Sequence, residues 1–209
     1  MLPSTATVIA MDPGGTTGWA VFDVHPEALI DPEVSILENI NFWTHGQTDC
    51  GSTKGNLGDS PHRGISTTGE AAGVAELVGL CRSWPGACVV IEDFIVRRMD
   101  QSRDFLSPVR ITAAISQWLW QQNRHYFVQQ PSHAKATVTD ERLKRWGLYR
   151  SEGGLNHARD ADRHAIAFLR KCKADPAFRL KAFPHLYGPN MLYGPVVKKK
   201  KESASLAQG

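Results

Sequence analysis

Residues 6–23 constrain the fold of this chain more than any other segment. Residues 6–11 (ATVIAM) are apolar and include β-branched side chains, which is typical of a buried strand. The DPGG that follows has turn chemistry, because Pro fixes φ and the glycines permit a tight reversal. Residues 16–23 (TTGWAVFD) indicate a second strand. The sequence therefore predicts a hairpin whose first strand ends at Asp12.

The rest of the chain alternates between strand-like and helix-like patterns. Elements of both kinds are expected, in chain order, as a strand near 35–44, a Gly-, Ser- and Thr-rich loop over 45–65, a helix over 68–83, a strand within 87–96 (ACVVIEDFIV), a helix over 106–122, a strand within 125–131 (HYFVQQP), a helix over 132–146 and a helix over 157–172. Three leading strands followed by alternating helices and strands predict an α/β fold with a mixed central sheet flanked by helices.

The length bounds the domain organisation. The 209 residues suit one domain and are too few for two full lobes. We expect that domain to cover residues 1–175, followed by an extended C-terminal segment, 176–209, with a basic, disordered tail. No apolar run approaches the ~20 residues that cross a membrane, and the start of the chain lacks the layout of a signal peptide. The expected location is therefore the cytoplasm.

The charge is divided unevenly along the chain. Residues 1–96 hold 3 Lys and Arg against 12 Asp and Glu, whereas residues 97–209 hold 21 against 9. The first part therefore carries −9 and the second +12, and a basic half of this kind suits a polyanion such as nucleic acid. The four cysteines do not have zinc spacing, so any metal is expected to be a hard cation with oxygen ligands.

Three acidic residues stand out by their positions. Asp12 and Glu92 each end an apolar strand, and Asp160 opens the late helix. A carboxylate at the end of a buried strand is costly unless its charge is compensated. Together the three describe a cluster at one edge of a sheet, whose mutual repulsion Mg²⁺ or Mn²⁺ would relieve. Two ions ~4 Å apart would then suit hydrolysis of a phosphodiester.

The late helix offers further candidates. His157, Asp160 and His164 fall on one face because they are three and four residues apart. Asp160 is favoured as a ligand, with His157 as a second ligand or as a residue that orients water. Asp162 points elsewhere and is expected to pair with a nearby Arg. His164 suits packing and function equally well.

These segments resemble a known family. The sequence VIAMDPGGTTGWAVF is similar to the first strand-turn-strand of RuvC-type Holliday junction resolvases, VVIEDF to their second acidic strand, and HARDADRHAIAFL to their last helix. The order and spacing match over residues 6–172, most closely in the bacteriophage versions. The resemblance implies an RNase H-like fold, a homodimer, and Mg²⁺- or Mn²⁺-dependent cutting of branched DNA such as four-way junctions. It carries the catalytic and metal-binding roles to Asp12, Glu92, His157 and Asp160.

The resemblance also implies a basic DNA-binding surface. Its counterparts here are Arg97, Arg98, Arg103, Lys135, Lys144 and Arg145. Phe94, Phe105 and Trp146 are candidates for stacking on an opened base, with core packing as the alternative. The helix over 106–122 is a candidate dimer seam. Trp118 and Trp120 lie two residues apart in it, so at least one is expected to be exposed or in an interface.

Three other functions remain open on the sequence. DPGGTTG also resembles the phosphate loop of actin- and sugar-kinase-type phosphotransferases, but those need two lobes and a second Gly-rich loop. A non-catalytic junction-binding protein is a second alternative, although its carboxylates would have no reason to be intact. A nuclease of the same fold that acts on flaps or RNA–DNA hybrids is the third. The alignment of the last helix leaves Asp162 as a possible substitute for Asp160.

Overall fold

A computed structural model describes residues 5–51, 68–95, 106–150, 155–189, 191 and 193. Its strands are β1 (Ala6–Asp12), β2 (Thr16–Val24), β3 (Ile40–Asp49), β4 (Cys88–Glu92) and β5 (Tyr126–Gln129). Its α-helices are α1 (Thr68–Ser83), α2 (Ser107–Gln121), α3 (Pro131–Thr137), α4 (Asp140–Arg145), α5 (Asn156–Ala174), α6 (Pro176–Ala182) and α7 (Pro184–Tyr187), with short 3-10 turns at Pro26–Leu29 and Leu37–Asn39. None of the described helices has both the length and the apolar character to cross a bilayer.

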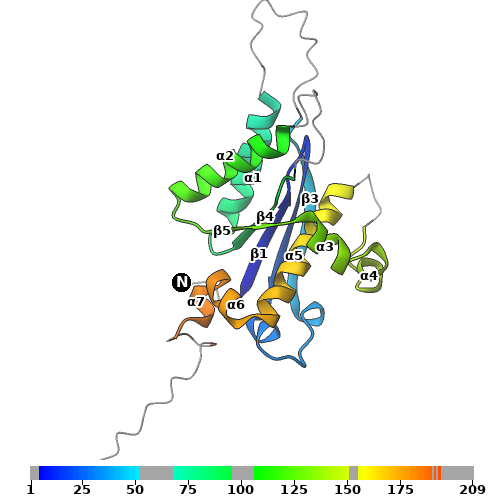
Figure 1. Cartoon of the computed structure of the whole chain (residues 1–209), viewed down its shortest axis with the longest axis vertical. Coiled ribbons are helices and arrows are strands. Elements are labelled where there is room, and N and C mark those ends of the chain that lie inside the picture. Colours follow the sequence, from blue (N-terminus) through cyan, green and yellow to red (C-terminus); the bar gives the residue numbers. More distant parts are fainter. Residues whose placement is uncertain are drawn as a thin grey trace, which may run out of the picture.

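The five strands form one mixed sheet in the order β3-β2-β1-β4-β5 (Figure 1). The strands β1 and β2 make the predicted hairpin, and β2 pairs antiparallel with β3. The strands β4 and β5 run parallel to β1, so their carboxyl ends meet at one edge of the sheet. The predicted mixed sheet with flanking helices is confirmed.

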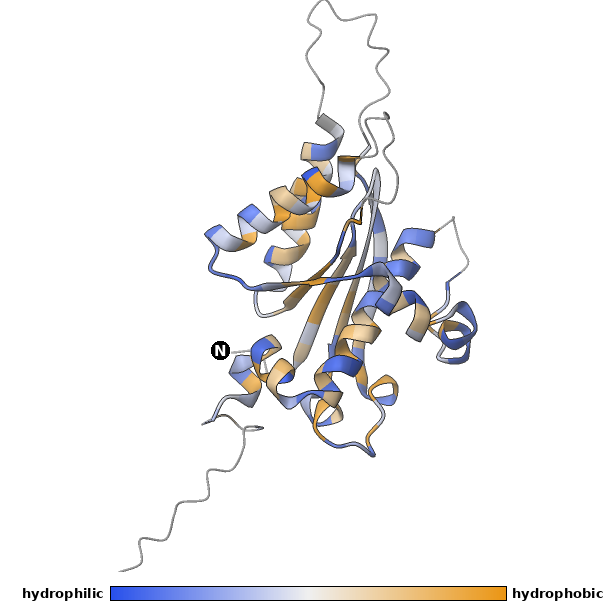
Figure 2. Cartoon of the chain, viewed as in Figure 1, coloured by the Kyte–Doolittle hydropathy of each residue, from blue (hydrophilic) through white to orange (hydrophobic). Residues whose placement is uncertain are grey.

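Successive side chains of β1 and β4 point to opposite faces of the sheet, and each face is covered by helices. Val8 and Ala10 of β1 belong to the core beneath α5, whereas Ile9 and Met11 belong to the core against α1 and α2. Figure 1 shows α1 and α2 on one side of the sheet and α5 crossing the other, and Figure 2 shows the apolar strands between them. Asp12 follows Met11 and therefore faces the α5 side.

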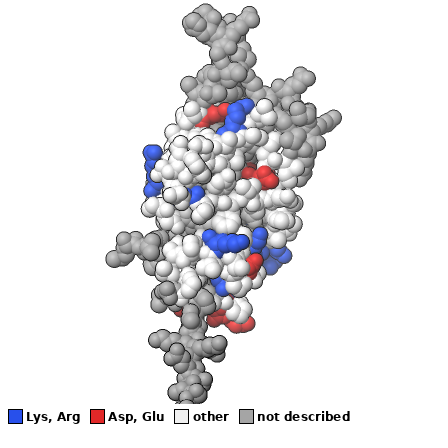
Figure 3. All heavy atoms as spheres, turned by 60° about the vertical axis from the view of Figure 1, so that its left-hand side comes forward, with Lys and Arg blue, Asp and Glu red and all other residues white. Residues whose placement is uncertain are grey.

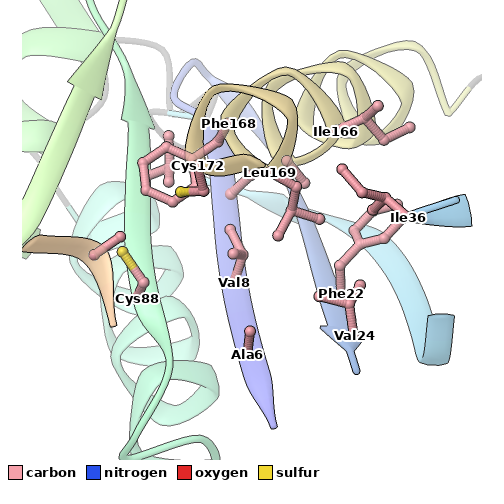
Figure 4. Packing of buried hydrophobic residues seen from close by; sticks show 14 of the residues in the cluster. Ala6, Val8, Phe22, Val24, Ile36, Cys88, Ile166, Phe168, Leu169 and Cys172 are labelled. Atoms are coloured by element: carbon pink, nitrogen blue, oxygen red, sulfur yellow. The ribbon is translucent and has the colours of Figure 1, made fainter. Parts of the chain in front are cut away.

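The helix α5 packs on the sheet through apolar residues. Ile166, Phe168, Leu169 and Cys172 lie against the strands, where Val8 is among their neighbours (Figure 4). All are buried, and each fully buried side chain of this kind contributes about 1.5–3 kcal/mol relative to an exposed one. This packing fixes the position of the helix and of its polar residues.

The structure corrects three sequence expectations. The third strand runs from Ile40 to Asp49 rather than over 35–44, because the polar residues 45–49, expected to begin a loop, pair fully with β2. The helix expected over 132–146 is two helices, because Val138 is extended and Thr139 caps α4 by accepting a hydrogen bond from the Arg142 amide.

The third correction concerns the C-terminal segment. An extended chain was expected from residue 176, yet α6 and α7 follow directly and Phe183, Leu186 and Tyr187 are buried in the core under α5. Proline at the start of each helix and the Asp175 cap explain their beginnings. The packed part of the chain therefore extends to at least Tyr187, and the lysine-rich tail lies outside the described residues.

The start of α5 lies unusually close to β2. A Cβ added at Gly18 would lie 2.0 Å from the carbonyl oxygen of His157. Gly18→Ala therefore has to displace the backbone of α5, and overpacking of this kind costs about 1–3 kcal/mol. We expect the free energy of unfolding, measured with denaturant, to fall by at least that amount.

The matched control for this prediction is Gly79→Ala in α1. A Cβ added at Gly79 meets nothing within 4 Å. Removing a glycine from a helix interior is worth about 0.5–1 kcal/mol, so this variant should be more stable than the wild type. If Gly18→Ala were as stable as Gly79→Ala, the close approach of α5 to β2 would be refuted.

Candidate active site

The pairing of β1 with β4 brings the first two acids together. Met11 pairs with Ile91 in parallel register, and the next residues are Asp12 and Glu92. Neighbours in parallel register point to the same face, so both carboxylates face α5. Each side chain is 13 % exposed. The site is thus two recessed carboxylates side by side at the edge of the sheet.

The helix α5 crosses above these acids and contacts both. His157 Nδ1 lies 2.9 Å from Asp12 Oδ2, and His164 Nε2, two turns later, lies 2.7 Å from Glu92 Oε2. Asp160 lies between the two histidines in sequence and bonds Lys135 Nζ of α3 at 3.1 Å and the guanidinium of Arg163. Asp12 and Glu92 are thus neighbours, Asp160 is near enough for its charge to act on Asp12, and four basic side chains bond the three acids.

Two polar contacts of β3 hold α5 in this position. The Gln47 side-chain oxygen accepts hydrogen bonds from the amides of His157 and Ala158 at 3.0 and 3.4 Å, and so caps the helix from a neighbouring strand. Gln47 belongs to the segment expected to be a loop, and no local pattern marks it as a cap. Its role depends entirely on the pairing of β3 with β2.

Asp162 is the second contact between α5 and β3. It is completely buried and accepts hydrogen bonds from Trp43 Nε1 at 2.8 Å and from His45 Nδ1 at 2.6 Å. The expectation that it pairs with an Arg is therefore wrong, because its partners lie on a strand that was predicted to end at residue 44. Burial raises the pKa of the Asp162 carboxyl despite these bonds. Asp160, in contrast, is near enough to Asp12 for its charge to act on that carboxylate.

The charges of the neighbouring acids act on Asp12. The pKa of Asp12 is raised, first by burial and then by the charges of Glu92 and Asp160, although the bond to His157 opposes this. The pKa of Lys135 is also raised. Its partial burial opposes that shift, but the hydrogen bond and charge of Asp160, with the charges of Glu92 and Asp12, outweigh it. Lys135 thus stabilises a crowded set of negative charges.

A hollow of about 300 Å³ adjoins this cluster. Glu92 and Lys135 line it, together with Phe94, which the sequence analysis marked as a stacking candidate. The lining therefore includes an aromatic side chain as well as two residues of the charged cluster.

The donor atoms suit a hard divalent cation in type. Carboxylate oxygens are what Mg²⁺ and Mn²⁺ prefer, and the recessed acids repel one another as such ligands do. Nevertheless, in the part of the chain that the structure describes, no three His, Cys, Asp or Glu side chains gather closely enough to hold a metal ion as they stand. The acids bond histidines, Lys135 and Arg163 instead, so a cation would have to draw them together.

Of the remaining predicted site residues, some lie outside the described part of the chain and the others lie on or next to α4. Arg97, Arg98, Arg103 and Phe105 lie outside the described residues. Lys144 and Arg145 are exposed on α4, where Lys144 lies 4.8 Å from the Tyr149 ring. Trp146 packs against the core with Arg170 over its ring, which is the alternative to base stacking.

Two solved structures share this architecture. A structure of Thermus thermophilus RuvC has a TM-score of 0.55 and is 13% identical, with the match covering 81% of this chain and 96% of that chain. The structure of T. thermophilus RuvC in complex with Holliday junction substrate has a TM-score of 0.52 with the same identity and coverage. No family model and no curated protein matches the sequence.

The sheet order, the flanking helices and the likeness to these two structures define the fold class of the protein. The chain has an RNase H-like fold. More particularly, it has the RuvC-type fold that was expected from its motifs. At this level of identity the likeness establishes the fold, and the chemistry has to be argued from the residues above.

The contact between His157 and Asp12 should make the stability of the protein depend on pH. The hydrogen bond to Asp12, with the charges of Asp12 and Asp160, raises the pKa of His157 above its ordinary value of about 6.5, although burial opposes it. The pair stabilises the folded protein fully when the pH is below the pKa that His157 has in the unfolded chain. This stabilisation is lost as the pH rises through the higher pKa of His157 in the folded protein. We expect an NMR titration of the metal-free protein to give a pKa above 6.5 for His157.

Asp12→Asn removes the charge and should lower the pKa of His157. His185 is the internal control, because burial lowers its pKa and it lies in α7 rather than at the acidic cluster. Its titration should be the same in both proteins. An unchanged His157 pKa in Asp12→Asn would show that the two side chains are not in contact.

Proposed function

We propose that this protein is a metal-dependent endonuclease that hydrolyses phosphodiester bonds in branched DNA, with four-way junctions as its substrate class. The observation that carries the proposal is that Asp12 and Glu92 lie side by side at the carboxyl ends of β1 and β4, with Asp160 of α5 near enough for its charge to act on Asp12. Three acids crowded at an open edge have no structural benefit of their own. They suit a site that binds cations and, through them, phosphate.

Asp12, Glu92 and Asp160 would hold the cation, with His157 as a further ligand or as the residue that orients water. When bound, Mg²⁺ or Mn²⁺, in a two-ion site, supplies an activated water and neutralises charge on the phosphate. His157 is suited to orienting water because its side chain is about half exposed while Nδ1 is fixed by Asp12. Lys135 can leave Asp160 and contact a phosphate oxygen, since it reaches the cluster from an exposed helix.

The basic half of the chain supports a nucleic-acid substrate. On and after α4, cationic side chains lie over aromatic rings, with Arg150 over Trp43 at 4.7 Å and Arg159 over Tyr149 at 4.9 Å. Guanidinium groups that rest on aromatic rings are well placed to contact a phosphate backbone. One of the similar solved structures is that of T. thermophilus RuvC in complex with Holliday junction substrate, which supports branched DNA over flaps and hybrids.

A homodimer is part of the proposal, because paired cuts across a junction need two active sites. The predicted seam, α2, has exposed apolar residues, with Trp120 73 % exposed and Val109 and Leu106 also exposed. The neighbouring edge strand β5 adds Tyr126 and Val128. Figure 3, which brings this side forward, shows wide areas of surface with neither acidic nor basic side chains. Such a surface suits a second copy better than DNA.

The decisive experiment compares four-way, flap, duplex and RNA–DNA hybrid substrates side by side in Mn²⁺. We expect preferred nicking of the four-way junction. Asp12→Asn and Glu92→Gln should each lower the cleavage rate by more than about 100-fold, beyond what loss of an outer partner of a metal usually costs, because each removes a charged ligand. Junction binding in a gel-shift assay should persist in both.

Two results would contradict this proposal. Cleavage retained in either variant would remove the acids from the active site. Tight junction binding by the wild type with no cleavage in Mg²⁺ or Mn²⁺ would instead favour a non-catalytic junction-binding protein. Preferred cutting of a flap or hybrid would keep the nuclease and change its substrate.

The basic surface makes a separate prediction. In Lys144→Ala/Arg145→Ala, junction affinity should fall, and the slope of log K against log salt should become shallower by about one for each phosphate that is no longer neutralised. The cleavage rate at saturating protein should change little. Lys181→Ala, an exposed lysine in α6, is the control and should leave both quantities unchanged. An unaltered salt slope in the double variant would remove α4 from the DNA-binding surface.

A further inference from the structure

His164 lies beneath the acidic cluster and has two polar partners. Its side chain is 0 % exposed. Nε2 lies 2.7 Å from Glu92 Oε2, and Nδ1 lies 3.1 Å from Gln129 Oε1. Glu92 and Gln129 are register partners on β4 and β5, so the imidazole spans the ends of two adjacent strands. Both nitrogens of the ring therefore lie within hydrogen-bonding distance of a polar side chain.

Packing alone does not account for a histidine here. The neighbouring positions of α5 that face the sheet, Ala161, Ala165 and Ile166, are apolar and fully or almost fully buried. A buried polar ring is costly unless its nitrogens are bonded, and an apolar side chain would fill the same space without that cost. The distinguishing property of His164 is thus the bond to Glu92.

That bond restrains one oxygen of a flexible side chain. An ionised carboxylate only accepts hydrogen bonds, so Nε2 of His164 donates to Oε2. A Glu side chain held at Oε2 keeps a fixed orientation and has its second oxygen for another ligand. Asp12 differs, because its histidine partner, His157, is about half exposed and can move away. Asp12 therefore has a partly exposed histidine partner, whereas Glu92 has a buried one.

We propose that His164 is a positioning residue for Glu92, which it holds through Oε2 so that the other oxygen is presented to the divalent cation. This inference rests on the proposed function. Outer partners that orient a ligating carboxylate typically contribute 10–100-fold to metal affinity or activity. Gln129 has a supporting part, since its contact with Nδ1 fixes the rotation of the ring.

The test compares two amide substitutions that differ only in reach. In His164→Gln the amide nitrogen can take the place of Nε2 and donate to Glu92. In His164→Asn the shorter amide can take the place of Nδ1 and contact Gln129 but cannot reach Glu92. We expect Mn²⁺ affinity, measured by calorimetry without DNA, to fall about 10–100-fold in His164→Asn and to be largely restored in His164→Gln.

Three further measurements separate positioning from stability. Thermal unfolding of the metal-free variants should be similar, and the KM for a four-way junction should stay near the wild-type value while kcat falls in His164→Asn. His185→Asn is the remote control, because it alters another part-buried histidine and should leave Mn²⁺ affinity unchanged. His164→Leu provides the same comparison with His164→Gln if the Asn variant does not fold.

The outcomes distinguish this inference from the proposed function. If the wild type binds Mn²⁺ and cuts junctions while His164→Asn binds Mn²⁺ equally well, the positioning role is overturned and the nuclease stands. If His164→Gln is as weak as His164→Asn, the bond to Glu92 is not what the ring supplies, and the inference also fails. If the wild type neither binds Mn²⁺ nor cuts DNA, the proposed function fails and the inference fails with it.

Discussion

The crowding of three carboxylates at one edge of the sheet is the constraint on which the rest of this structure depends. Asp12 and Glu92 are placed side by side by parallel pairing, and Asp160 comes from the helix above them. Like charges in a recessed site destabilise the fold unless partners offset them. His157, His164, Lys135 and Arg163 do so here, and each comes from α3 or α5. The packing of these helices is thus coupled to the electrostatics of the site.

The helix α5 has the central part in that coupling. Its apolar face packs on the sheet, while Asp162 bonds β3, Gln47 caps its first turn, and His164 meets β4 and β5. Contacts with strands toward both edges of the sheet fix the helix along its length and about its axis. A small rotation of α5 would move His157 and Asp160 away from Asp12 together. The buried polar network around Asp162 is therefore part of what positions the site, although it lies outside it.

The site has its basic groups arranged in two ways. His164 and Arg163 are held within the fold, whereas His157 and Lys135 reach the acids from partly exposed positions. Exposed partners can leave when a cation or a phosphate arrives, because water can replace them at little cost. Buried partners cannot leave without losing the bonds that offset their burial. Under the proposed function, this division would let the acids be stable without a cation and still accept one.

Sequence patterns by themselves determined the hairpin that ends at Asp12, the strand that ends at Glu92, and the late helix with its spacing of three and four. These features are local, since alternation, turn chemistry and helical periodicity involve residues close in the chain. The sequence did not determine the partners of Asp162, the cap from Gln47, the break at Val138 or the packing of residues 176–187, because each depends on an element distant in the chain. The two polar partners of His164, Glu92 and Gln129, likewise became known only when β4 and β5 were placed beside α5. Tertiary structure decided these matters because a polar side chain in the interior takes its role from whichever strand the fold brings within hydrogen-bonding distance.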